Sequence, residues 1–171
     1  MATFKGTGVV TTNDFHTVTW TGKTKKGNSI VITLNHAINR GNMDWTMAEK
    51  DDVVQQVEFE GCYANTDHMT STASDYVEPW TIAYTAGGSD TAADEIILGA
   101  GVFAIDGTDV ALTRGGGQFT VEREFREINA DGDRGAVYNR LVIDASRPKL
   151  TLNTLTFLTS MTKIYAAIST T

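Results

Sequence analysis

The stretch "GQFTVEREFREINADGDRGAVYNRLVIDASRPKLTLNTLTF" covers residues 117–157 and decides the fold. Between 118 and 127, Phe119, Val121 and Phe125, with Arg123 among them, occupy alternate positions. The positions between them are polar: Gln118, Thr120, Glu122, Glu124 and Arg126. A period of two predicts a β-strand with one face on a core and the other in water. We therefore expect Phe119, Val121 and Phe125 to be buried.

This strand and the segments that follow it predict a long hairpin. Residues 136–145 and 149–157 can continue the sheet, and Pro148 fits the start of a strand, where no ladder donor is needed. The strand at 118–127 is about twice the usual length of five or six residues. Strand edges without a partner invite association, so the sequence favours self-assembly as the way to complete the sheet.

Most of the remaining chain also predicts strands, because its apolar runs are rich in Val, Ile, Thr and aromatic residues. The expected strands are 14–20, 28–37, 53–64, 78–85, 95–98, 101–105 and 109–114. "DGT" at 106–108 is a tight-turn signal. Amphipathic spacing predicts one helix near 156–167, and a second short helix is possible at 42–52. The expected fold is mainly β.

Composition and charge limit the classes of function. Fourteen basic and 21 acidic residues give a net charge of −7, the wrong sign for tight binding to phosphates. The single Cys62 excludes an internal disulfide and is expected to be a small buried hydrophobe. "MATFKGTGVV" lacks a signal-peptide pattern and no apolar run approaches 18 residues, so we expect synthesis in a cytoplasm and no membrane partner.

The chemical motifs are weak. "NADGDRG" at 129–135 resembles the opening of a calcium loop, but Arg134 replaces the required Gly and Arg140 the bidentate Glu, which favours a solvated hairpin loop. "RGGG" at 114–117 lacks the Lys-Ser/Thr of a phosphate loop and predicts a flexible turn. The three histidines, His16, His36 and His68, fall in separate segments. We expect no enzyme activity, no catalytic residue, no cofactor and no metal.

At this point the sequence resembles a known family. Residues 103–157, "FAIDGTDVALTRGGGQFTVEREFREINADGDRGAVYNRLVIDASRPKLTLNTLTF", resemble the N-terminal half of tail tube proteins of long-tailed bacteriophages and prophages. Residues 14–64 with "EPWTIAYT" at 78–85 look like the C-terminal half of the same family. The resemblance implies a tail-tube-like β-sandwich or partial barrel with a long hairpin and one flanking α-helix.

The order of the two halves departs from the family. Residues 1–85 match its C-terminal half, 93–171 match its N-terminal half, and "AGGSDTA" at 86–92 reads as a flexible linker between them. We therefore expect one tail-tube-like domain over 1–171 that is circularly permuted, and the resemblance of Gly-Gly-Ser-Asp at 87–90 to a designed flexible linker suggests engineering. The alternative, two tandem domains, requires each half to close its own core, and neither half contains an obvious complete sheet.

The resemblance also implies a function. Family members form hexameric rings that stack into a hollow tube in the virion tail, and the genome passes through it during DNA ejection. The chain would then assemble with itself and other tail proteins and meet DNA only as passing cargo. The candidates to face the lumen are Gln118, Thr120, Glu122, Glu124 and Arg126; the candidates for a loop between rings are Asn129, Asp131, Gly132, Asp133 and Arg134.

A stand-alone β-sandwich binding module, such as a virion decoration protein or a carbohydrate-binding protein, is the alternative class. Three Trp and five Tyr could supply a platform for sugar rings. However, Trp20, Trp45 and Trp80 are scattered along the chain, and aromatic residues in strands are more often part of a core.

Overall fold

The computed structural model describes residues 3–23, 28–41, 54–64, 77–85, 101–128, 141–155 and 161–170. Within these ranges the protein is mainly β, as predicted, with two antiparallel sheets and one short α-helix. The strands are β1 (Phe4–Gly6), β2 (His16–Lys23), β3 (Ser29–Asn39), β4 (Val54–Gly61), β5 (Trp80–Thr85), β6 (Val102–Ile105), β7 (Thr108–Glu127), β8 (Leu141–Leu155) and β9 (Ile168–Thr170). A 3₁₀ turn spans Thr12–Asp14, and α1 spans Met161–Ile164.

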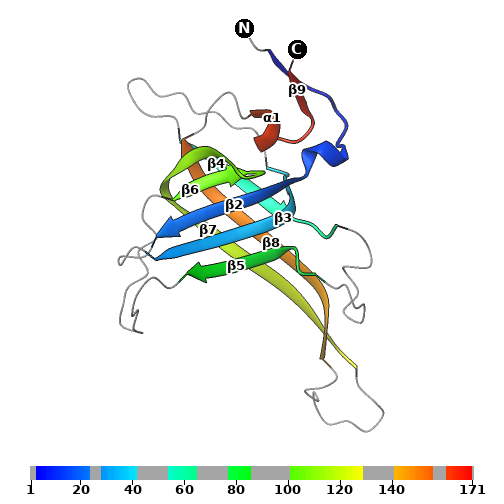
Figure 1. Cartoon of the computed structure of the whole chain (residues 1–171). Coiled ribbons are helices and arrows are strands. Elements are labelled where there is room, and N and C mark those ends of the chain that lie inside the picture. Colours follow the sequence, from blue (N-terminus) through cyan, green and yellow to red (C-terminus); the bar gives the residue numbers. More distant parts are fainter. Residues whose placement is uncertain are drawn as a thin grey trace.

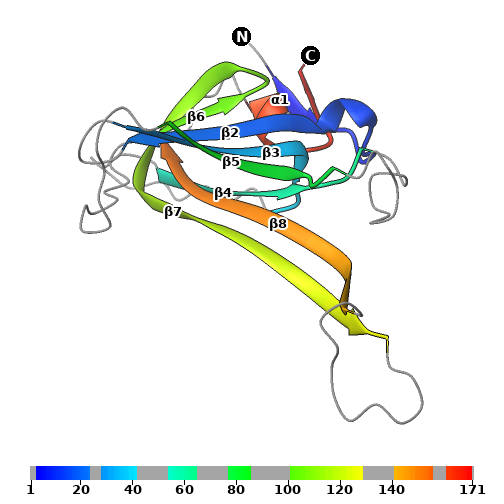
Figure 2. The same ribbon diagram turned by 60° about the horizontal axis from the view of Figure 1, so that its bottom comes forward.

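The large sheet curls into a closed circuit. Its strand order is β2-β6-β7-β8-β4-β3-β5, and an additional pairing joins β2 to β3, so the six strands from β2 round to β3 close on themselves. β3 can reach both β5 and β4 because its direction changes at His36, which has a positive φ of 47°. Figures 1 and 2 show the result as two layers, with β2, β3 and β5 lying over β4, β8 and β7. This architecture is the predicted sandwich or partial barrel.

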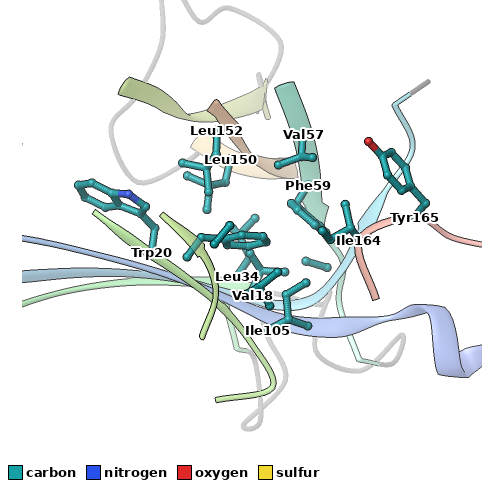
Figure 3. Packing of buried hydrophobic residues seen from close by; sticks show 14 of the residues in the cluster. Val18, Trp20, Leu34, Val57, Phe59, Ile105, Leu150, Leu152, Ile164 and Tyr165 are labelled. Atoms are coloured by element: carbon teal, nitrogen blue, oxygen red, sulfur yellow. The ribbon is translucent and has the colours of Figure 1, made fainter. Parts of the chain in front are cut away.

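The core lies between the two layers. It draws its side chains from both sides of residues 86–92, including Leu34 and Phe59 before them and Phe103 and Leu150 after them. Figure 3 shows these buried side chains converging from opposite strands. The Phe59 and Phe103 rings lie 5.5 Å apart at an interplanar angle of 45°, a tilted arrangement that aromatic pairs prefer.

Trp20 closes one end of the core, and two glycines make room for its indole ring. A Cβ atom at Gly22 or at Gly101 would collide with that ring. The backbone N–H of Gly101 donates to Thr113 Oγ1 at 3.1 Å, and the indole N–H of Trp20 lies 3.5 Å from the same oxygen. Glycine is therefore required here for space rather than for conformational freedom.

The turn at 106–107 is the predicted tight turn. Asp106 and Gly107 have φ values of 50° and 74°, and Ile105 pairs with Thr108 across them, as in a two-residue type I′ hairpin. The Asp106 carboxylate accepts hydrogen bonds from the Thr17 backbone N–H at 3.0 Å and from His16 Nδ1 at 2.8 Å. The turn is thus fastened to the start of β2.

The segment before β2 is held against the end of the chain. β1 pairs with β9, placing Phe4 opposite Thr170. The Asp14 carboxylate accepts from the backbone N–H groups of Thr11 at 2.6 Å and Ala167 at 2.8 Å. The N- and C-terminal strands therefore lie side by side (Figure 1).

Several expectations about individual elements were wrong. The predicted flexible turn at 114–117 lies inside β7, where Gly115 and Gly116, with φ values of 83° and 89°, form a bulge between the Thr113 and Gly117 pairs. Pro148 lies inside the continuous β8 strand rather than at a strand start. The ladder between β4 and β8 ends at Lys149, so no described strand on that side requires a backbone N–H from position 148, and proline is tolerated there.

The helix is shorter than predicted. α1 contains four residues, and β9, which the sequence did not predict, follows it. A positive φ of 55° at Ala167 turns the chain into β9. The possible helix at 42–52 and the strand at 95–98 lie outside the described residues.

Candidate functional site

The long strands β4, β8 and β7 present a charged surface on the side facing away from the core. The ladder places Gln118 opposite Thr151, Thr120 opposite Lys149, and Glu122 opposite Arg147. On the other side of β8, Glu58 is opposite Thr151 and Glu60 is opposite Lys149. The charged outer face is defined here by six side chains: Glu58, Glu60, Glu122, Glu124, Arg147 and Lys149.

Alternation along each strand produces this face. The side chains of Val57, Phe59 and Leu150 point into the core, so the residues between them point outward. Gln118, Glu122, Glu124 and Arg126 are exposed and Thr120 is half-buried. Four predicted lumen-facing residues, from Gln118 to Glu124, thus share one side of β7.

The cations on this face are paired with carboxylates. Arg147 Nη1 lies 2.9 Å from Glu124 Oε1, and Lys149 Nζ lies 3.5 Å from Glu58 Oε1. Arg40 Nη1, from beyond the end of β3, lies 3.3 Å from Glu60 Oε2. Exposed pairs of this kind each contribute about 0 to 1 kcal/mol to stability. Their main effect is on the electrostatic field of the face, where four carboxylates are set against the three cations Arg147, Lys149 and Arg40, which leaves a small excess of negative charge.

Arg126 belongs to a neighbouring pair instead. The register of the β7–β8 ladder shifts between Glu124, which pairs with Ala145, and Phe125, which pairs with Ile143. Asp144 between them has no partner on β7 in the ladder and forms a bulge. Arg126 Nε donates to both oxygens of Asp144, at 3.1 Å and 2.8 Å. These hydrogen bonds to a carboxylate raise the pKa of Arg126 further above its ordinary value.

The hairpin extends beyond the rest of the sheet. β6 pairs with β7 only up to Leu112, and β4 pairs with β8 only up to Lys149, whereas β7 and β8 pair with each other as far as Glu127 and Leu141. Among the described residues, 115–127 and 141–148 therefore have no ladder partner on their outer edges. Figure 2 shows this two-stranded ribbon projecting away from both layers.

The projection overturns the expectation that Phe125 is buried. Its side chain is 62% exposed, because the ribbon extends beyond the second layer at this point and no described strand of that layer covers Phe125. Val121 is half-buried. Phe119, nearer the body, is half-buried against Trp80, with ring centroids 5.6 Å apart. Ile128 is 49% exposed, so within the described part of the hairpin both Phe125 and Ile128 are uncovered near its far end.

Two of the three tryptophans are structural. Trp20 is 7% exposed in the core, and Trp80 is half-buried beside Phe119. The Arg123 guanidinium lies 5.8 Å from the Trp80 ring centroid, and its Nη2 is 3.9 Å from Glu78 Oε1. Trp45 lies outside the described residues.

The candidates for a loop between rings, Asn129 to Arg134, lie outside the described residues, as does the calcium-like motif at 129–135. Among the residues that the structure describes, no group of three or more His, Cys, Asp or Glu side chains could hold a metal ion. Cys62 is half-buried, and burial raises the pKa of its thiol despite the nearby Arg40.

Sequence reasoning missed several members of the charged outer face. Glu58 and Glu60 alternate with Val57, Phe59 and Gly61, a signal of the same kind as that in 118–127. Arg147 could not be placed from the sequence because the register between β7 and β8 depends on the bulges at 114–116 and at Asp144.

No helix among the described residues is long and apolar enough to cross a membrane. Comparisons of the chain with protein-family models, with curated proteins and with solved structures found no match.

Proposed function

We propose that this protein is the structural subunit of a phage-type tail tube, which assembles with copies of itself into hexameric rings and hollow tubes. The observation that carries the proposal is the projecting β7–β8 ribbon. Over 115–127 and 141–148 its outer edges have no ladder partner among the described residues. Edges of this length are normally covered, and ring closure would cover them with strands of neighbouring copies.

The charged outer face supports a lumenal role for the same ribbon. Glu122 and Glu124 lie on the side of β7 away from the core, and Glu58 and Glu60 extend the acidic surface onto β4. A wall with excess negative charge repels phosphates, so DNA slides past it rather than binding. The role is electrostatic and requires no catalysis.

The strand order supports a circular permutation of the family pattern. β2 pairs with β6 and β4 pairs with β8, so the block β6-β7-β8 from after 86–92 is joined at both of its edges to strands from before 86–92 in one sheet. The pairing of β1 with β9 keeps the N- and C-terminal strands adjacent, the geometry that a permutation requires.

The lumenal role is tested by replacing Glu122 and Glu124 with Lys. The double variant changes the charge by four units per subunit and turns the bore of a ring positive, so DNA retention at low salt should increase strongly and fall as salt rises. Two single variants that each change the charge by two units control for position: Glu122→Lys on the charged outer face and Asp109→Lys on the β6–β7 side, of which only the first should increase DNA retention. DNA binding by assembled wild-type, double-Lys and control proteins is measured as a function of salt. Normal assembly without increased binding would show that these residues do not line the bore.

The alternative binding module is tested in parallel. A glycan array probed with the purified, dispersed protein should give no signal, because Trp20 is buried and Trp80 is engaged with Phe119 and Arg123. Specific binding of a glycan by monomers would favour the alternative.

A further inference from the structure

A second outward surface, on the opposite layer from the charged outer face, has a different character. One ladder row crosses five strands and consists of Ala83, Val31, Thr21, Val102 and Leu112. We call this row and its flanking threonines, Thr19 and Thr33, the uncharged face. Its side chains point away from the core, because their neighbours along the strands, such as Trp20 and Phe103, are buried.

The uncharged face is accessible and apolar for a sheet surface. Leu112 is 51% exposed, Ala83 is exposed, and Val31, Thr21 and Val102 are half-buried, as expected within a sheet. Figure 2 shows β2, β3 and β5 as the layer farther from the β7–β8 ribbon. Copies of a chain with net charge −7 repel one another, and this repulsion is weakest between surfaces without carboxylates.

Three charged residues border the uncharged face in its described part: the cations Lys23 and Arg114, the latter two residues beyond Leu112 on β7, and the acidic Asp109. Lys23 follows Thr21 on β2, opposite Ser29, whereas Asp109 lies opposite Ala104 on β7, in the row that contains Thr19. They are therefore on opposite sides of the central row. A two-fold arrangement can place Lys23 of one copy against Asp109 of another, and the self-complementarity this needs is typical of dimers.

We propose that the uncharged face binds the uncharged face of a second copy, forming a face-to-face dimer separate from the hairpin contacts of the proposed ring. The uncharged face is five strands wide, with the strands about 4.8 Å apart, and about five residues long, at about 3.4 Å per residue. Its area is therefore about 400 Å² on each copy. The total, roughly 800 Å², is below the 1,200–2,000 Å² of stable interfaces. The dimer is consequently weak and forms at high concentration.

Sedimentation equilibrium from about 10 µM to about 1 mM tests the proposal in the Phe125→Glu background, in which the rings of the proposed function are not expected to form. We expect a reversible monomer–dimer equilibrium, weakened about tenfold or more by Leu112→Glu because it desolvates a carboxylate in the contact. Val77→Glu in the same background is the matched control: Val77 is 50% exposed but lies outside the uncharged face, so its dimerisation should equal that of Phe125→Glu alone. Equal effects of the two added substitutions, or a Phe125→Glu protein that is monomeric at every concentration, would overturn the proposal.

A charge exchange identifies the partner as a second copy. Lys23→Asp and Asp109→Lys should each weaken the dimer, and the double variant should restore it; failure of the double variant to recover overturns the two-fold arrangement. Electron microscopy of the wild type and sedimentation of Phe125→Glu, which alters only the hairpin end, separate the two proposals. Dimers of Phe125→Glu support the uncharged face, whereas wild-type rings together with a monomeric Phe125→Glu protein support the proposed function and overturn the dimer.

Discussion

At the scale of the residue, exposure rather than hydrophobicity decides how much each aromatic side chain contributes to the free energy of unfolding. Phe125 is 62% exposed at the end of the ribbon, whereas Phe59 is 1% exposed in the core. We expect Phe125→Ala to change the free energy of unfolding of the monomer by about 0.5 kcal/mol or less. Phe59→Ala should cost about 3 to 5 kcal/mol. Chemical denaturation of dispersed protein measures both, and a cost above 2 kcal/mol for Phe125→Ala would mean that the monomer buries this side chain.

Two carboxyls near the start of β2 make stability depend on pH. Burial raises the pKa of Asp106, but hydrogen bonds from Thr17 and His16 outweigh burial and leave the pKa below its ordinary value. The pKa of Asp14 is lowered in the same way by the Thr11 and Ala167 hydrogen bonds. A carboxyl whose pKa is lower in the folded state stabilises the protein above its unfolded pKa, and that stabilisation is lost as pH falls through the folded value.

The expected result is a loss of stability below about pH 4, and Asp106→Asn should flatten this part of the profile. Asp109→Asn is the control, since its carboxylate makes no hydrogen bond or ion pair among the described residues. Thermal unfolding between about pH 2 and pH 7 provides the measurement. Identical profiles for wild type and Asp106→Asn would show that the link from Asp106 to β2 contributes nothing.

At the scale of the element, close packing at Gly117 fixes where β7 resumes its ladder after the bulge. A Cβ atom at Gly117 would lie 2.7 Å from both Leu152 Cδ2 and Thr151 O. Gly117→Ala should therefore cost about 1 to 3 kcal/mol, as overpacked sites do. Gly6→Ala is the control because a Cβ atom there meets nothing within 4 Å. Equal midpoints of denaturation for the two variants would contradict the close approach of β7 to β8.

The same elements show how far the sequence can predict the fold. Strict alternation in 118–127 predicted a strand with Glu122 and Glu124 on one side, and "DGT" predicted the turn at 106–107, because both are local properties of the chain. The burial of Phe125 depends on where the second layer ends, which is a tertiary property. The bulge at 115–116 and the position of Pro148 beside the end of β4 likewise depend on neighbouring strands, so local patterns misplaced them.

At the scale of the whole molecule, the two outward surfaces of the large sheet differ in charge. The charged outer face extends onto the projecting ribbon, whereas the uncharged face lies on the opposite layer. The composition of the chain constrains only its net charge of −7. The position of Glu58, Glu60, Glu122 and Glu124 on one face depends on the register of β4, β8 and β7, and it could not be predicted from a single strand.

Electron microscopy of the purified protein tests self-assembly through the ribbon most directly. The account predicts closed rings or stacked tubes for the wild type. Phe125→Glu and Ile128→Glu should give folded protein without rings, because each places a carboxylate on the apolar end of the hairpin. Val9→Glu, at a residue 62% exposed like Phe125 but on the N-terminal segment away from the ribbon, should still form rings. Dispersed wild-type particles at every concentration, or rings that survive both hairpin variants, would contradict the account.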